Sequence, residues 1–149
     1  MTDLLLALAH HLLVFVLAGL LAAEAALLRP GLDATQLGLL SRLDAAYGLC
    51  AGLILAVGFS RVFFGIRGSE FFLANPWFWA KIAAFVVVGA LSAPPTIRFI
   101  AWRRALQADA TFRPAAGDVR RVRTILIAEI IAFAFIPLFA AAMVRVPFL

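Results

Sequence analysis

Nine ionisable side chains lie within or at the ends of long apolar stretches of this 149-residue chain. They are His10, His11, Glu24, Asp44, Tyr47, Arg61, Lys81, Arg98 and Glu129. Imidazole, amine and carboxyl groups can ligate metals, bind anions or carry protons, and each is costly in hydrocarbon without a partner or a function. We therefore expect any activity of this chain to depend on these residues.

The apolar stretches cover residues 4–28, 45–64, 77–100 and 125–144. As a helix, each is long enough to cross a bilayer core of about 30 Å. The composition, 65% hydrophobic and 14% charged, leaves too little polar surface for a soluble domain. The sequence therefore predicts an all-α integral membrane protein, a four-helix bundle of up-down topology with a single domain over residues 1–149.

Lys and Arg residues concentrate on one side of this predicted bundle. Nine of the thirteen lie in the loop 101–124, after the first apolar run, or at adjacent helix ends: Arg29, Arg42, Arg98, Arg103, Arg104, Arg113, Arg120, Arg121 and Arg123. The positive-inside rule puts this side in the cytoplasm, so both termini are predicted to be outside, with Arg61, Arg67, Lys81 and Arg145 at the outer helix ends. The rule also explains the net charge of +5, so we expect a lipid bilayer and not nucleic acid as the partner.

The first apolar run is expected to remain on the protein. It carries Asp3 and no Lys or Arg before it, and it exceeds the roughly 7 to 15 residues of a cleaved signal core. The sequence Arg29-Pro30-Gly31 ends this run, because proline disfavours helix in the residue before it and glycine permits a reversal.

Proline residues mark features of the later helices. Asn75-Pro76 is expected to open the third helix, with Asn as the cap and Pro at the first helical position. Pro94-Pro95 is expected to bend or end that helix, and Pro137 to kink the fourth near its middle.

One group of polar residues lies near the predicted cytoplasmic side. At about 1.5 Å per residue, Glu24, Asp44, Tyr47, Arg98 and Glu129 fall at similar depth. The acids can pair with the arginine and lock the bundle without any chemistry. Alternatively, they can relay protons or cations in a small transporter or a pore subunit.

A second group, near the outer side, contains bases and no carboxyl group. His10, His11, Lys81 and Arg61 would repel one another as cations unless they meet water, reach the surface or bind an anion. Because adjacent helical residues point about 100° apart, only one of the two histidines can face a given site. That histidine can be hydrogen-bonded across helices, or it can ligate haem iron. For haem b the iron ligand would be His10, or alternatively His11, with Lys81, Met143, water or another protomer as the second ligand.

Small residues form a further pattern, Gly48-x-x-x-Gly52 followed by Ala56. Small residues at this spacing let helices approach closely in lipid. The partner of this face is predicted to be either another helix of the same chain, or a second protomer or membrane protein.

Several segments resemble an uncharacterised bacterial family of predicted four-helix membrane proteins, a domain of unknown function without assigned activity. They are residues 42–48, 58–61, 75–81, 94–99 and 102–104, and the resemblance covers nearly the whole chain. Together with the positions of the Lys and Arg residues, it predicts a bacterial inner-membrane, multi-pass protein with a cytoplasmic loop 101–124 and periplasmic termini.

A second resemblance is to the bacterial four-helix protoporphyrinogen oxidase family. It is carried by His10, by Ala18-Gly19-Leu20 and by an aromatic-rich segment that ends in Lys81. The chain departs from that family at Arg29-Pro30, where the family has a Pro-Arg pair. The resemblance implies a haem b site that uses the histidine and the lysine.

The leading hypothesis is a haem b or porphyrin site near the outer face, formed by His10 or His11 with Lys81 and Arg61. Such a protein would serve electron transfer or porphyrin oxidation, as a haem-dependent membrane oxidoreductase. The alternatives are a proton- or ion-coupled transporter subunit, or a structural or assembly subunit without catalysis. The sequence contains no zinc-ligand spacing, glycine-rich phosphate loop or serine triad.

Overall fold

The computed structural model describes residues 2–65 and 68–146, which form helices and connecting loops without strands. The helices are α1 (Thr2–Leu27), α2 (Ala34–Phe64), α3 (Gly68–Leu73), α4 (Pro76–Ala108) and α5 (Ala116–Arg145). All but α3 are long and apolar enough to cross a membrane. The predicted all-α fold with four candidate spans is confirmed.

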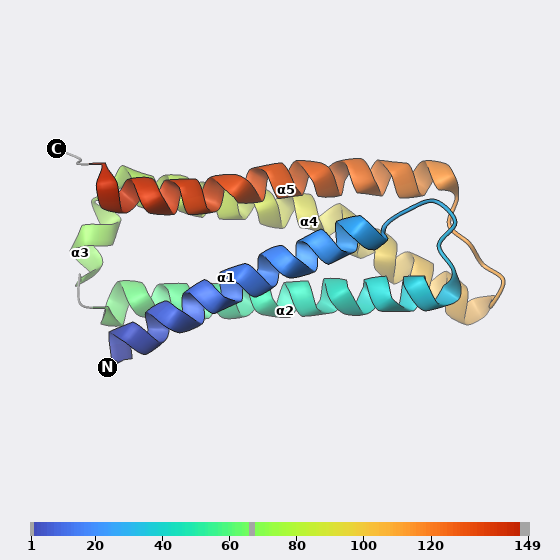
Figure 1. Cartoon of the computed structure of the whole chain (residues 1–149), viewed down its shortest axis with the longest axis horizontal. Helices are drawn as coiled ribbons and strands as arrows, with labels where there is room; N and C mark the ends of the chain where they lie inside the picture. The colour runs from blue at the N-terminus through green and yellow to red at the C-terminus, as the bar shows by residue number, and fades with distance from the viewer. Residues whose placement is uncertain (1, 66–67, 147–149) are drawn as a thin grey trace.

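Consecutive long helices run in opposite directions (Figure 1). The start of α1, the end of α5 and the short helix α3 lie at one end of the bundle, which we call the α3 end (Figure 1). The connections between α1 and α2 and between α4 and α5 lie at the other, the basic-loop end (Figure 1). Helix α1 packs along α2 and α4 along α5, while contacts between these two pairs are fewer and are made mainly by α2 and α4. The bundle is therefore two helix pairs joined along part of their length.

Three helices extend further toward the basic-loop end than the apolar runs predicted. Helix α2 begins at Ala34 because Asp33 and Gln36 form a capping box: the Asp33 carboxylate accepts from Gln36 N at 2.8 Å, and the Gln36 amide oxygen accepts from Asp33 N at 3.0 Å. Likewise α4 continues to Ala108 and α5 already begins at Ala116. Hydropathy locates the membrane segment, whereas the polar ends of these helices extend beyond it.

The predictions made from the prolines are confirmed in one case and wrong in another. Asn75 caps α4 as predicted, since its side-chain oxygen accepts from Trp77 N at 2.9 Å and Pro76 takes the first helical position. The expectation that Pro94-Pro95 might end α4 is wrong, because the helix runs through both residues, and α5 likewise runs through Pro137. The outer connection contains the short helix α3, and the predicted outer residue Arg67 lies outside the described residues.

The apolar core is concentrated toward the basic-loop end. Its buried members come from both helix pairs and include Leu21 and Leu40 from one pair and Phe99, Val119 and Leu126 from the other. A smaller cluster at the α3 end consists of Val62, Phe72 and Phe78. The outer polar residues His10 and Lys81 lie between these two clusters.

We predict that the basic-loop end faces the cytoplasm. In a Cys50→Ala background, Ala110→Cys in the α4–α5 loop should react with a membrane-impermeant maleimide only in inverted vesicles, because the excess of arginines holds this end inside. Glu70→Cys in α3, an exposed position at the opposite end, is the matched control and should react only in right-side-out cells. The opposite labelling pattern would reverse the assigned orientation.

Candidate functional site

An apolar groove lies between the helix pairs near the α3 end, and we call it the outer groove. All four long helices line it, and its cavity measures about 70 Å³. The lining consists of His10, Val14 and Leu17 from α1, Ile54, Leu55, Gly58, Phe59 and Val62 from α2, Phe78, Lys81, Ile82 and Phe85 from α4, and Phe133 and Ile136 from α5. His10 and Lys81 are the only ionisable residues in this lining, and the sequence placed both at this depth.

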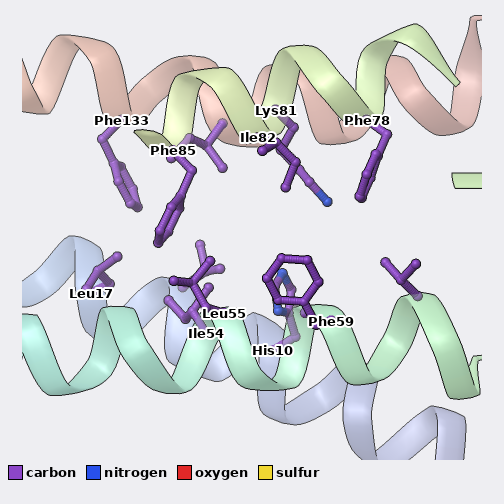
Figure 2. A pocket seen from close by; sticks show the side chains of 14 residues that line it. His10, Leu17, Ile54, Leu55, Phe59, Phe78, Lys81, Ile82, Phe85 and Phe133 are labelled. Carbon is purple, nitrogen blue, oxygen red and sulfur yellow. The ribbon is translucent and has the colours of Figure 1, made fainter. Parts of the chain in front are cut away.

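The two bases enter the groove from opposite walls. Figure 2 shows Lys81 reaching from α4 toward His10 and Phe59, which belong to the other helix pair. The His10 Nδ1 atom is buried and has no hydrogen-bond partner among the described residues. Gly58 lies beside the imidazole, since a Cβ atom at this position would lie 3.4 Å from His10 Cε1, an ordinary van der Waals contact. His10 therefore presents a nitrogen that is not committed to any contact within the described chain.

Among the described residues, the cationic groups in and beside the outer groove have no carboxylate as an ion-pair partner. Lys81 Nζ lies 5.1 Å from the centre of the Phe78 ring, a cation–π contact. Arg61 interacts electrostatically with both His10 and Lys81, and its Nε atom is buried without a hydrogen-bond partner. Among the described residues no carboxylate forms an ion pair with these bases. The arrangement can accept an anion without displacing an internal partner.

His11 does not belong to this site. Its side chain is exposed on the outside of α1, and its Nδ1 lies 2.6 Å from the Ala7 carbonyl oxygen one turn earlier. The angular argument is therefore upheld, since the two adjacent histidines point to different environments. The alternative assignment of His11 as the groove residue is wrong, because helix rotation directs it away from the partner helices.

The inner polar residues form a second group toward the basic-loop end. Tyr47 donates to Glu129 Oε1 at 2.6 Å, and Thr96 donates to Asp44 Oδ1 at 2.6 Å. Glu24 is 2% exposed and Glu129 is 1% exposed, and the Glu24 Oε1 atom has no hydrogen-bond partner among the described residues. The sequence analysis missed Thr96, although its hydroxyl group at the depth of the acids was the available signal.

Arg98 lies outside this inner group, so the predicted charge lock is wrong. Pro95, Phe99 and Trp102 form the buried face of α4, and Arg98 is exposed beside them. Adjacent residues point about 100° apart, which turns the guanidinium away from the acids. No ion pair with an arginine compensates Glu24, Asp44 or Glu129 within the described part of the chain.

The acids and histidines do not assemble a multi-ligand metal site. Within residues 2–65 and 68–146, no group of three or more His, Cys, Asp or Glu side chains could hold a metal ion. The possible chemistry is therefore anion binding or ligation through one imidazole at the outer groove, and proton or cation binding at the inner acids.

Comparison with known protein families identifies the family of this chain. A family model described as "Predicted membrane protein (DUF2214)" matches residues 2–146. The chain belongs to this family of predicted membrane proteins. This agrees with the first sequence resemblance, while nothing found supports the second, to haem-binding protoporphyrinogen oxidases. No curated protein and no solved structure matches the chain.

The small-residue face of this membrane protein is not covered by its own helices. Gly48, Gly52 and Ala56 are exposed on α2, and a Cβ atom at either glycine would have no neighbour within 4 Å. The alternative of a helix partner within the chain is therefore wrong. A second protomer or another membrane protein at this face stays a prediction.

Removing the Tyr47 hydroxyl should destabilise the bundle. Tyr47→Phe leaves the buried Glu129 oxygen without its donor, so we expect the free energy of unfolding to fall by about 1–3 kcal/mol, measured by denaturant titration in detergent. Thr124→Val is the control, because that exposed hydroxyl only donates to the Arg120 carbonyl oxygen of its own helix, and its effect should stay below about 0.5 kcal/mol. Equal effects of the two variants would contradict a special role for the buried bond.

Proposed function

We propose that the outer groove binds an amphipathic anion, with its apolar body between the helix pairs and its acid group at Lys81 and Arg61. Haem b or another porphyrin is the ligand of this class that the sequence analysis favours. The observation that carries the proposal is the meeting of His10 and Lys81, from different helix pairs, in one apolar groove whose lining, among the described residues, contains no carboxylate.

The electrostatics of the groove favour an anionic ligand. Cationic groups removed from water are costly unless an opposite charge or hydrogen-bond acceptor compensates them. A carboxylate or phosphate beside Lys81 and Arg61 would form charge-assisted hydrogen bonds. Because Lys81 and Arg61 come from different helix pairs, an acid group held by both would also draw the pairs together.

The remaining walls favour an apolar ligand body. Aromatic side chains from both helix pairs, among them Phe59, Phe85 and Phe133, face the groove (Figure 2). Aromatic rings offer large apolar contact areas and stack on flat conjugated ligands. An acyl chain or a planar ring system would both match these walls.

A porphyrin fits the donor atoms of the groove but not its closed volume. The His10 imidazole suits iron, Lys81 in the lining suits a propionate group, and Arg61, outside the lining, adds positive charge nearby. However, a cavity of about 70 Å³ has room for about two water molecules, whereas cofactor sites measure roughly 300–1,000 Å³. Binding would therefore require the helix pairs to separate at the α3 end. A haem held there would supply electron transfer or porphyrin oxidation chemistry.

Haemin titration of the detergent-purified protein tests the proposal. We expect a Soret band that shifts on binding and again on reduction with dithionite. His10→Ala should abolish the shift, and Lys81→Met should raise the dissociation constant by about 10- to 100-fold through loss of a charge-assisted contact. His11→Ala is the matched control, because the neighbouring imidazole lies outside the groove, and it should bind as the wild type does.

A fluorescent fatty acid extends the test to ligands without iron. Binding of the fatty acid, weakened by Lys81→Met but not by His11→Ala, would support an amphipathic-anion site even if haemin fails to bind. If neither probe binds, or if His10→Ala and His11→Ala behave alike with haemin, the proposed function is wrong.

A further inference from the structure

Three inner carboxyl groups, from three helices, lie within electrostatic range of one another, and we call them the carboxyl cluster. Glu24 comes from α1, Asp44 from α2 and Glu129 from α5, and Glu24 interacts electrostatically with the other two. Hydroxyl donors satisfy one oxygen of Asp44 and one of Glu129. Glu24 is 98% buried, and its Oε1 atom has no partner among the described residues.

Among the described residues, Arg103 and Arg104 line a crevice together with Asp44, but no basic side chain forms an ion pair with the carboxyl cluster. Two neutral hydroxyl groups donate hydrogen bonds to the acids of the cluster, Tyr47 from α2 and Thr96 from α4. Arg98 is exposed on another face of α4, and no ion pair between an arginine or lysine and the cluster exists within the described chain. Three ionised carboxylates this close together, largely removed from water, would repel one another without compensation. Some other positive charge must therefore neutralise them.

We infer that the carboxyl cluster binds at least one proton, held by Glu24 and exchanged with the basic-loop side through Asp44. A protonated carboxyl group is neutral and gains an O–H donor, which can be shared with a neighbouring carboxylate. Packing alone does not explain a carboxyl group at this buried position, because a leucine would fill it without the desolvation cost. A bound proton gives Glu24 a role beyond packing.

A crevice supplies the exchange route. It lies between α2 and α4 at the basic-loop end, measures about 490 Å³, and has Asp44 and Thr96 in its lining. At about 30 Å³ per water molecule, this volume can hold a chain of waters up to Asp44. Asp44 is partly exposed and therefore connects this water to the buried Glu24.

The surroundings favour a proton over a metal cation. Arg103 and Arg104 line the same crevice, and their positive charge disfavours the entry of sodium or other cations. The same charge also opposes a proton, but a proton forms a covalent O–H bond with one carboxylate, whereas a hard metal cation needs several oxygen ligands. The described acids also lack the ligand grouping of a metal site.

The proton site is closed toward the outer groove. The side chains of Leu17, Leu21 and Ile54 are buried in the apolar core between the carboxyl cluster and His10. The cluster therefore exchanges protons with one side only, and it is independent of ligand binding at the outer groove.

Infrared spectroscopy of the full-length protein in detergent tests this inference. At neutral pH we expect the carbonyl stretching band of a protonated carboxylic acid, which shifts when H₂O is replaced by D₂O. Glu24→Gln should remove at least one such band. Glu70→Gln, the same change at an exposed position in α3, should leave the spectrum unchanged.

Further variants and salts make the test decisive. If Glu24→Gln fails to fold, as judged by circular dichroism, Glu129→Gln takes its place, and loss of the band in either variant supports the proton site. A spectrum without a protonated carboxyl band in the folded wild type would overturn the inference. So would a band that disappears when choline chloride is replaced by sodium chloride at equal ionic strength, because sodium would then be the bound cation.

Discussion

Two hydrogen bonds from hydroxyl groups to carboxyl groups join the helix pairs, and the arrangement of the remaining structure depends on them. Tyr47 of α2 reaches Glu129 of α5, and Thr96 of α4 reaches Asp44 of α2, so each bond crosses from one pair to the other. Helices in lipid gain little from the hydrophobic effect, and each interhelical hydrogen bond contributes only about 0.6 kcal/mol on average. The apolar core packed around these bonds adds the remaining stability, which explains why the pairs are joined firmly at one level and loosely elsewhere.

The two polar groups of the bundle lie at different depths. Toward the basic-loop end, the apolar core surrounds acids, two of which accept hydrogen bonds from hydroxyl donors. Nearer the α3 end, the helix pairs enclose a groove where His10 and Lys81 face one another. Buried leucine and isoleucine side chains separate the two groups. The membrane protein therefore holds acidic and basic groups at different depths, and each group lacks the partner that the other could have provided.

The sequence predicted the depth of residues better than their direction. Length, hydropathy and proline signals were sufficient for the four spans and for the Asn75 cap, and helix geometry separated His10 from His11. The predicted direction of the Arg98 side chain was wrong, because the side of a helix that faces its neighbours depends on packing. In a soluble helix a polar face reveals that side, but here both the lipid-facing and the core-facing surfaces are apolar. The same ambiguity hid the exposure of Gly48 and Gly52 and the contact of Thr96 with Asp44.

The buried hydrogen bonds join the helix pairs toward the basic-loop end, whereas the small cluster of Val62, Phe72 and Phe78 packs between them at the α3 end, and this has a mechanical consequence. If the pairs separate, they rotate about the hydrogen-bonded connection, so displacement grows with distance from it along the bundle. Residues beside the pivot, such as Tyr47 and Glu129, move least, while the walls near His10 and Lys81 move most. The short helix α3 bridges the pairs at the far end and limits how wide they can open (Figure 1). In such a motion the two pairs would act as levers, with the outer groove widening most and the buried Glu129 staying nearly in place.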